Sequence, residues 1–480
     1  MSRTCIICGV AANSREHVFP AALGGRRTNK GIYCEKHNNA YSDLADIIVD
    51  QLRFFNSQLG VVGDHQRVSG AVTPVLLIDP AINAYVRLSD RSANFVAPRI
   101  LTPQDHAEGG CTFVLAANSP DEAETFVAEM RRNGAEISID SVGKQGIYYL
   151  GTLDGKFELG GTETGLRSLA YIAQTFLAHT FPDLARLPEL AALKEYTLTG
   201  SGANYAWWQS PIDDGLEAVS KPFAHRVIVG HNADDGMIYA RISLYSAFHF
   251  GVALGVVPTT TSRSVVFDID PLAKHEPHDV QQTKYEDAVG YVQRPHDLTA
   301  NHLAAIKSGQ AQAAVVSLMQ RIQVQQLKGT ATKWLQELAR VKPVDQESAN
   351  LFFERLVFEE SARVLLLTET FQHDFSDFTA GIDNVPLATL SSHISAHCDR
   401  DPNSVDGLSV YGRTLLKTAC VALQRQLSED FFRNQLDQDR MEMLMGGGLG
   451  LHTVGVAILD QVSQDVFGQA TSESDGQIAS

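Results

Sequence analysis

The first 57 residues are polar and punctuated by glycine until a single periodic stretch near their end. In that stretch, apolar side chains recur at intervals of three and four residues, which places them on one face of a helix. These side chains are Leu44, Ile47, Ile48 and Leu52. The pattern predicts a small module over residues 1–57 that is closed by a helix.

Between residues 58 and 295 the pattern changes to short apolar runs that alternate with turn residues, which is typical of β-strands. The runs cover residues 75–78, 111–115, 147–150, 227–229, 237–244, 247–257 and 265–267. Two helices interrupt them. Ser119 and Glu122 form a capping box with Pro120 at the first helical position, and apolar residues recur at helical spacing over 166–177. We expect a mixed α and β domain whose role the pattern does not indicate.

Long segments rich in Ala, Leu, Gln, Glu and Arg follow, with few glycines and prolines before Asp383. They predict a mainly helical region over residues 296–469. Residues 470–480 are small and polar and cannot bury enough surface to offset the entropy of ordering, so we expect a flexible tail. The fold class expected is therefore α+β and multidomain: a small N-terminal module, a mixed α/β middle region and a helical C-terminal region.

Composition agrees with a folded chain of this kind. The protein has 480 residues, of which 44% are hydrophobic and 20% charged, against about 45–50% and 25% in globular proteins. A chain of this length is expected to form two or three domains. The longest apolar runs, 247–257 and 446–459, fall short of the roughly 18 residues that cross a bilayer and contain His249 and His452.

Charge narrows the range of partners. The formal net charge of −17 would repel a polyanion, yet residues 1–40 hold six Lys and Arg against two Glu, a local charge of +4. Any nucleic-acid site is therefore expected in this segment. No membrane partner is expected, and the N-terminus lacks the basic flank and apolar core of a secretory signal. We expect a cytoplasmic protein.

Three of the six cysteines lie within the first 34 residues. Cys5 and Cys8 are separated by two residues, and Cys34 is separated by two residues from His37. Thiolate and imidazole ligands in this spacing are typical of structural zinc sites, which small modules need because their own core is small. A redox role for the first pair would require a thioredoxin-like βαβ context, which the glycine-rich start does not provide.

Residues between these two pairs, together with the residue directly after the second pair, form a second pattern. It consists of Glu16, His17, Pro20, Gly24, Gly25, Asn29 and Asn38. In this order and with the zinc pairs around it, the segment resembles the HNH endonucleases, in the branch that carries Glu-His in place of Asp-His. Two positions depart from the family: His37 stands where cysteine is usual, and Glu16 where aspartate is commoner. The resemblance covers about a ninth of the chain.

The resemblance implies a ββα-metal module that hydrolyses phosphodiester bonds in DNA and leaves 5′-phosphate and 3′-hydroxyl ends. The chemistry of His17 fits this reaction, because an imidazole with a pKa near 6.5 can accept a proton from water at neutral pH. The alternative is an ordinary histidine whose hydrogen bonds are satisfied. Asn29 is the middle residue of the motif by resemblance, where its amide would tie the loop that orients His17; otherwise it is a turn asparagine before Lys30 and Gly31.

Glu16 and Asn38 provide two oxygen ligands. A site with only two protein ligands suits Mg²⁺ or Mn²⁺, which keep several waters and bind a phosphate as a further ligand. The alternatives are a helix cap for Asn38 and a solvated surface acid for Glu16. The basic residues Arg26, Arg27 and Lys30 are expected to bind phosphates of the nucleic acid, although basic loops are also common solubilising features.

The function expected is a metal-dependent HNH endonuclease that acts on DNA. His17 would be the general base, Glu16 and Asn38 would hold the divalent metal, and zinc would be structural. RNA stays an alternative substrate, because its 2′-hydroxyl offers a second nucleophile. The alternative of a different class is a zinc-containing module without catalysis that binds nucleic acid or protein.

Overall fold

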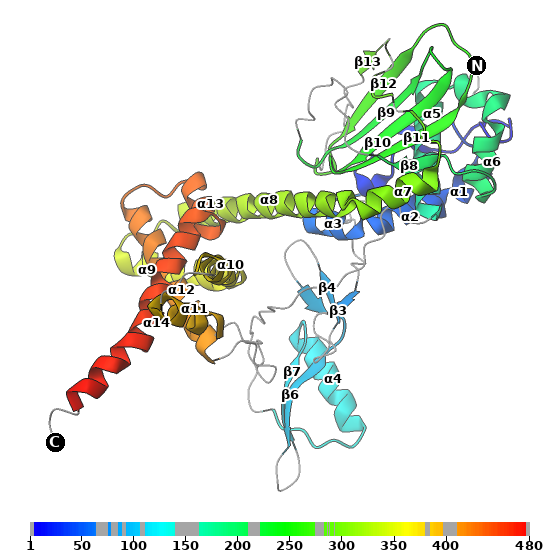
Figure 1. Ribbon diagram of the computed structural model, residues 1–480. Helices are drawn as coiled ribbons and strands as arrows, with labels where there is room; N and C mark the ends of the chain where they lie inside the picture. The colour runs from blue at the N-terminus through cyan, green and yellow to red at the C-terminus, as the bar shows by residue number, and fades with distance from the viewer. Residues whose placement is uncertain are drawn as a thin grey trace. The chain divides into compact units, whose positions relative to one another are not determined.

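The computed structural model of the chain contains two compact units, and each is described by itself (Figure 1). The first unit comprises Met1–Leu76, Tyr85–Val96 and Asp154–Ile322, and the second comprises Leu77–Ala84, Ala97–Leu153 and Gln323–Ser480. The structure describes residues 4–63, 75–77, 85–88, 93–105, 111–139, 163–209, 221–273, 283–285, 287, 289–291, 293–379, 385–396 and 410–476. The strand expected at 147–150 lies outside these residues.

The N-terminal segment of the first unit contains two short antiparallel strands followed by three helices. The strands are β1 (Glu16–His17) and β2 (Thr28–Asn29), with the 3₁₀ turn η1 (Ala21–Leu23) between them. The helices are α1 (Glu35–Ala40), α2 (Ser42–Gln51) and α3 (Arg53–Leu59). The helix expected from the apolar spacing is confirmed as α2, in which Leu44 and Ile48 are buried.

A six-stranded antiparallel sheet forms the centre of the first unit, in the order β13-β12-β9-β10-β11-β8. The strands are β8 (Ala206–Trp208), β9 (His225–His231), β10 (Met237–Leu244), β11 (Phe248–Val256), β12 (Arg263–Ile269) and β13 (Thr283–Tyr285). The four strands expected between residues 227 and 267 are confirmed as β9 to β12. Alternate residues of β10, from Ile238 to Leu244, enter the hydrophobic core because side chains alternate between the two faces of a strand.

Helix α5 (Glu163–Thr180) packs against this sheet and is buried along most of its length. The helix expected over 166–177 is therefore confirmed. One continuous hydrophobic core joins the N-terminal segment, α5 and the sheet, so the boundaries expected at residues 57 and 295 fall inside the first unit. The unit also contains η2 (Leu184–Arg186), η3 (Pro188–Leu190), α6 (Ala191–Thr199) and α7 (Leu298–Lys307).

Smaller strands lie between residues 75 and 116. β3 (Val75–Leu77), β4 (Tyr85–Leu88) and β5 (Ala93–Phe95) form a three-stranded sheet, and β6 (Arg99–Asp105) pairs with β7 (Cys111–Ala116). The expected runs near 75 and 111 are thus strands. Helix α4 (Pro120–Arg132) follows, and the Ser119 hydroxyl accepts a hydrogen bond from the Glu122 N–H at its start, as the capping box predicts.

The described residues from 310 onward are mainly helical, as the composition of this region predicts. The helices are α8 (Gln310–Val341), α9 (Gln346–Glu359), α10 (Ser361–Thr379), α11 (Val385–Ala396), α12 (Val410–Phe432), α13 (Gln438–Gly446) and α14 (Gly448–Gly476). The backbone of α14 continues to Gly476, into the segment expected to be a flexible tail, since neither proline nor glycine interrupts residues 469–475. Residues 477–480 lie outside the described residues.

Within the described residues, no single helix is both long and apolar enough to cross a bilayer. Helix α13 and the first part of α14, up to Val466, meet that requirement of length and composition when they are taken together, and they are bent by 46° relative to each other.

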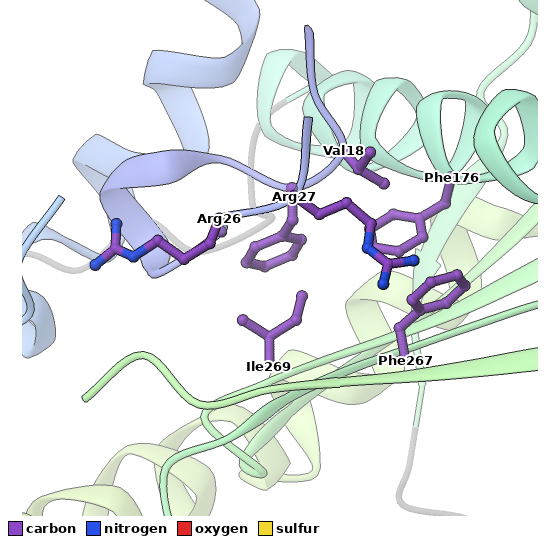
Figure 2. A pocket seen from close by; sticks show the side chains of 8 residues that line it. Val18, Arg26, Arg27, Phe176, Phe267 and Ile269 are labelled. Carbon is purple, nitrogen blue, oxygen red and sulfur yellow. The ribbon is translucent and has the colours of Figure 1, made fainter. Parts of the chain in front are cut away.

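The loop between β1 and β2 depends on two buried glycines. Gly24 has φ +88°, and a Cβ on it would lie 2.5 Å from the Cα of Pro271. A Cβ on Gly25 would lie 2.0 Å from the carbonyl oxygen of Phe19. The loop borders a small pocket lined by Val18, Phe19, Gly25, Arg26, Arg27, Phe176, Phe267 and Ile269 (Figure 2). The two glycines therefore allow the loop to pack closely against Phe19 and Pro271.

We expect Gly25→Ala to destabilise the first unit by about 1–3 kcal/mol, because the added methyl group would force the loop away from Phe19. Gly329→Ala is the matched control: Gly329 lies inside α8 and a Cβ on it would meet nothing within 4 Å, so alanine should be neutral or stabilising by up to about 1 kcal/mol. Urea unfolding of both variants measures the difference. Equal stability of Gly25→Ala and the unmodified protein would contradict the packing role of Gly25.

Candidate functional site

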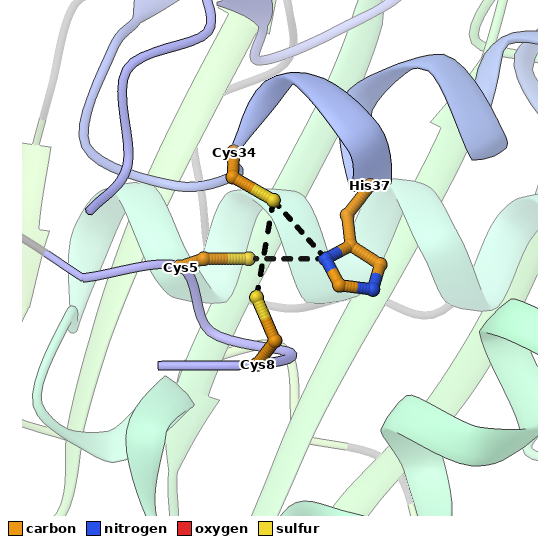
Figure 3. Close-up of side chains that lie close together, drawn as sticks. All are labelled: Cys5, Cys8, Cys34 and His37. Atoms are coloured by element: carbon orange, nitrogen blue, oxygen red, sulfur yellow. Dashed lines mark hydrogen bonds between the residues drawn. The ribbon is translucent and has the colours of Figure 1, made fainter. Parts of the chain in front are cut away.

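The four expected zinc ligands are brought together from two ends of the N-terminal segment (Figure 3). Cys5 and Cys8 lie on a tight turn in which the Gly9 N–H donates to the Cys5 carbonyl at 3.0 Å, and Gly9 adopts φ +73°. Cys34 is the N-terminal cap residue of α1, and His37 lies in the same helix. The turn and the start of α1 thus each contribute two ligands.

The ligand atoms all lie within 4.8 Å of one another, and three of the distances between them are close to those of a tetrahedral zinc site. The Cys5 Sγ lies 3.6 Å and the Cys34 Sγ 3.2 Å from His37 Nδ1, and the sulfurs of Cys8 and Cys34 are 3.8 Å apart. Bond lengths of about 2.3 Å to sulfur and about 2.0 Å to nitrogen place tetrahedral ligands about 3.5–3.8 Å from one another. The cluster can therefore hold a metal ion, and zinc is consistent with its ligands.

The local electrostatics of His37 and Cys5 also favour metal binding. Burial lowers the pKa of His37, and the charge of Lys36 lowers it further, so the ring is neutral and can offer a lone pair. Burial opposes ionisation of Cys5, but backbone N–H groups of Cys8 and Cys34 outweigh it and lower the pKa of the thiol. These shifts favour the protonation states that a zinc ion requires.

Glu16 is buried at the start of β1, with 8% of its surface exposed. Tyr171 of α5 donates a hydrogen bond from its hydroxyl to Glu16 Oε1, and the side chain of Asn38 also hydrogen-bonds to the carboxyl group. Burial raises the pKa of Glu16 to about 7, although both hydrogen bonds act in the opposite direction. Glu16 is therefore not the solvated surface acid of the alternative interpretation.

Asn38 lies in α1, one residue beyond the zinc ligand His37. Its Oδ1 is buried and has no hydrogen-bond partner among the described residues. A buried carbonyl oxygen without a partner costs free energy, and a cation next to the Glu16 carboxylate would satisfy it. Carboxylate and amide oxygens such as these are the ligand types that Mg²⁺ and Mn²⁺ prefer.

His17 follows Glu16 on β1, opposite Thr28 of β2, and is half-buried. Since neighbouring residues of a strand point to opposite faces, the imidazole lies on the other face of the hairpin from the Glu16 carboxyl. Glu16 and His17 are consecutive residues of β1. The expected metal ligand and the expected base are therefore adjacent in the backbone, although their side chains point to opposite faces.

Asn29 makes two hydrogen bonds. Its Oδ1 accepts from the Gly31 N–H at 2.7 Å, and its Nδ2 lies 2.9 Å from Nδ1 of His179 in α5. The first bond is that of a turn asparagine. The second connects β2 to α5. Asn29 therefore ties the hairpin to the helix that packs against the sheet, and both of these hydrogen bonds are made to residues other than His17.

The basic residues of the loop differ in their surroundings. The Arg26 guanidinium donates to the carbonyl oxygen of Val62. Arg27 points the other way (Figure 2), toward the ring of Phe267, whose centroid lies 6.0 Å from its Cζ. Lys30 is exposed on the turn after β2. Arg27 and Lys30 are therefore better placed than Arg26 to meet a phosphate.

Two residues of the site were missed by the sequence analysis: Tyr171 and His179, both on α5. They contact Glu16 and Asn29 across about 150 residues of chain. The helical spacing around Tyr171 indicates a buried helix but not the element it packs against. The available signal was that Tyr171 and His179, two residues with polar groups, lie about two turns apart on a helix that is otherwise mostly buried.

Comparison with known proteins finds no matching family model, no matching curated protein and no matching solved structure. The function of the site therefore has to be inferred from its own residues.

We expect the purified protein to contain one zinc ion per chain, and Cys8→Ser to lower that content well below one, because the remaining three ligands leave the tetrahedron incomplete. The variant should also make the N-terminal segment sensitive to protease, since metal binding contributes directly to folding. Elemental analysis and limited proteolysis measure both effects. Cys111→Ser, at an exposed cysteine of β7, should retain zinc; a zinc-free parent protein would refute the assignment.

Proposed function

We propose that this protein is a metal-dependent endonuclease of the HNH type that hydrolyses phosphodiester bonds in DNA. The observation that carries the proposal is the meeting of Glu16 and Asn38, with a buried Asn38 oxygen that lacks a partner among the described residues. Glu16 directly precedes His17 on β1, and Asn38 directly follows His37 of the cluster suited to zinc. The order of strand, strand and helix agrees with the ββα-metal fold that the resemblance implies.

In the proposed reaction, His17 accepts a proton from water as the water oxygen attacks phosphorus. The bond from phosphorus to the 3′-oxygen breaks, the leaving oxygen takes a proton from solvent, and the products are a 5′-phosphate and a 3′-hydroxyl. Glu16 and Asn38 would hold Mg²⁺ or Mn²⁺, which would stabilise charge on the phosphate. Asn29 fixes β2 against α5 and thereby keeps the hairpin that carries His17 in place.

DNA is the proposed partner because residues 1–40 carry a charge of +4 in a protein of net charge −17. Arg27 and Lys30 lie on or next to β2 and would bring positive charge close to the reacting phosphate. Such contacts position the polymer without reading its sequence. RNA offers the same phosphates and is the competing substrate in any assay.

One observation favours a second candidate, a zinc-containing nucleic-acid-binding module without catalysis. Tyr171 donates to one oxygen of Glu16, and burial raises the pKa of this carboxyl to about 7. A carboxyl that is partly protonated near neutral pH is a weaker metal ligand than an ionised one. Metal-dependent cleavage by the purified protein distinguishes the two candidates.

We expect the protein to cut plasmid DNA with Mg²⁺ or Mn²⁺, and His17→Ala to reduce the rate by about 10²–10⁴-fold, because the base is removed and no zinc ligand is. Glu16→Gln and Asn38→Ala should instead raise the concentration of Mg²⁺ or Mn²⁺ needed for half-maximal rate. Rates as a function of metal concentration separate these effects.

The matched control is His452→Ala, which removes an exposed histidine from α14 and should leave the rate unchanged. Zinc content should stay at the parental value in all four variants. A wild-type rate for His17→Ala would show that another residue is the base, and no cleavage by the parent protein with either metal would favour the second candidate.

We also expect a shallow dependence of DNA binding on salt. If only the basic segment touches phosphates, about three to six contacts release counterions, at about 0.9 logarithmic units of affinity per contact and decade of salt. Fluorescence anisotropy of a labelled duplex over a range of KCl concentrations gives the slope. A much steeper slope would mean that the main DNA-binding surface lies outside residues 1–40.

A further inference from the structure

The four expected zinc ligands lie on two arms of the N-terminal segment, residues 4–8 and 31–37. Arg186, at the end of η2, binds both arms. Its Nη2 donates to the carbonyl oxygen of Thr4 at 2.6 Å and to that of Gly31 at 2.8 Å. One guanidinium nitrogen therefore joins the two arms, and it comes from outside the segment that carries the resemblance.

The position of Arg186 is fixed by the chain around it. Leu184 and Ala185, the other residues of η2, are buried in the hydrophobic core of the first unit. The Arg186 side chain is half-buried, its Nη1 donates to the carbonyl oxygen of Pro182 at 2.5 Å, and its Nε lies 3.4 Å from Oγ1 of Thr4. The guanidinium is thus held by the core, and hydrogen bonds from a charged donor are stronger than those between neutral groups.

The two arms enclose a loop of the chain that contains the β1–β2 hairpin. Closing a flexible loop costs conformational entropy, and a metal ion with ligands on both arms has to meet this cost unless other contacts close the loop first. A backbone hydrogen bond from the Ile6 N–H to the Ile32 carbonyl, at 3.0 Å, joins the arms. The bonds of Arg186 to Thr4 and Gly31 close the same loop a second time.

We propose that Arg186 is a positioning residue of the Cys/His cluster, which holds the two ligand arms together before the metal binds. Less of the free energy of metal binding is then spent on ordering the arms, and more of it remains as affinity. The bonds to Thr4 and Gly31 go to backbone carbonyls, so they set where the arms lie. The role concerns the metal site alone and does not depend on the proposed nuclease function.

Two substitutions of Arg186 separate position from charge. Arg186→Met keeps an apolar stem but removes every N–H donor. Arg186→Lys keeps the positive charge, but its single ammonium group lies nearer the backbone than Nη2 and cannot span the carbonyls of Pro182, Thr4 and Gly31.

Arg167 of α5 provides the matched control. It is half-buried and also donates to two backbone carbonyls, at 3.0 Å and 2.6 Å, but these belong to Thr197 and Leu198 in α6. Arg167→Met and Arg167→Lys therefore remove a comparable pair of bonds from the same unit without touching either arm. Circular dichroism and thermal unfolding report whether each variant is folded.

Zinc affinity is measured on the full-length protein after metal removal under reducing conditions, by competition with a chromogenic chelator for added Zn²⁺. We expect both Arg186 variants to bind Zn²⁺ about tenfold more weakly than the parent, at the lower end of the 10–100-fold losses that are typical of residues orienting metal ligands. Both Arg167 variants should stay within about twofold of the parent, even where their melting temperature falls.

Hydrogen exchange of the metal-free proteins tests the arms directly. The Ile6 N–H should be protected in the metal-free parent and should exchange faster in Arg186→Lys, which also decides the matter if Arg186→Met does not fold. An unprotected Ile6 N–H in the metal-free parent would show that the arms are not held before metal binds, and would overturn the proposal.

Four results of the zinc titration would also overturn it. They are parental affinity in Arg186→Met, parental affinity in Arg186→Lys, an equal loss in the Arg167 variants, and a parent protein that does not bind Zn²⁺. The second would mean that charge and not position matters, and the third that any loss of stability lowers zinc affinity. Plasmid cleavage plays no part in these measurements, so the nuclease function and the role of Arg186 can fail separately.

Discussion

The first unit depends on how helix α5 buries polar side chains between the N-terminal segment and the sheet. Gln174 of α5 is buried, and its amide donates to the hydroxyls of Tyr33 and Tyr41, at 3.2 Å and 3.5 Å, and accepts from Thr197 at 3.1 Å. A buried amide that loses such partners costs about 1–3 kcal/mol. The network joins Tyr33 and Tyr41 of the N-terminal segment to α5 and to Thr197 of α6, and a satisfied buried network of this kind favours one arrangement of these parts.

The same helix positions the candidate site. Tyr171 and Tyr41 stack with ring centroids 4.7 Å apart, and the Tyr171 hydroxyl reaches Glu16. Two turns further along α5, His179 reaches Asn29. The hairpin is too short to hold its own geometry, because each strand has only two residues. A metal ion held by Cys5, Cys8, Cys34 and His37 would fix α1, and α5 fixes the hairpin, so the site would be supported from two directions.

Local features of the fold could be predicted from the sequence. The cap at Ser119 and the apolar stripe of α2 depend on neighbours three or four residues away, and the zinc cluster follows from spacings within 40 residues. The contacts of α5 with the hairpin join residues about 150 positions apart, and no spacing in the sequence indicates them. Tyr171 is one of many aromatic residues at a core position of a helix, and neither its hydrogen bond to Glu16 nor the sharing of one core could be derived from periodicity.

The burial of Glu16 illustrates the same limit. A glutamate in a basic, polar segment is expected at the surface, and its residue type gives no sign of the helix that covers it. In the sequence, Gly24 and Gly25 are only members of a motif, whereas the carbonyl of Phe19 and the backbone of Pro271 are what require glycine there. Tyr171 and Pro271 are distant along the chain from Glu16 and Gly24, and the neighbour of Gly25 is a backbone carbonyl. The pattern of hydrophobic and polar residues describes neither kind of contact.

The shared core limits how this protein could have exchanged parts during evolution. Tyr33, Tyr41 and Leu44 of the N-terminal segment are almost fully buried, and their apolar surface is covered in part by α5. A segment of residues 1–57 transferred to another protein would carry this surface uncovered, together with polar groups whose partners stay behind. Recombination would therefore have to move α5 and its sheet together with the Cys/His cluster, and the first unit, of more than 250 residues, would be inherited as a whole.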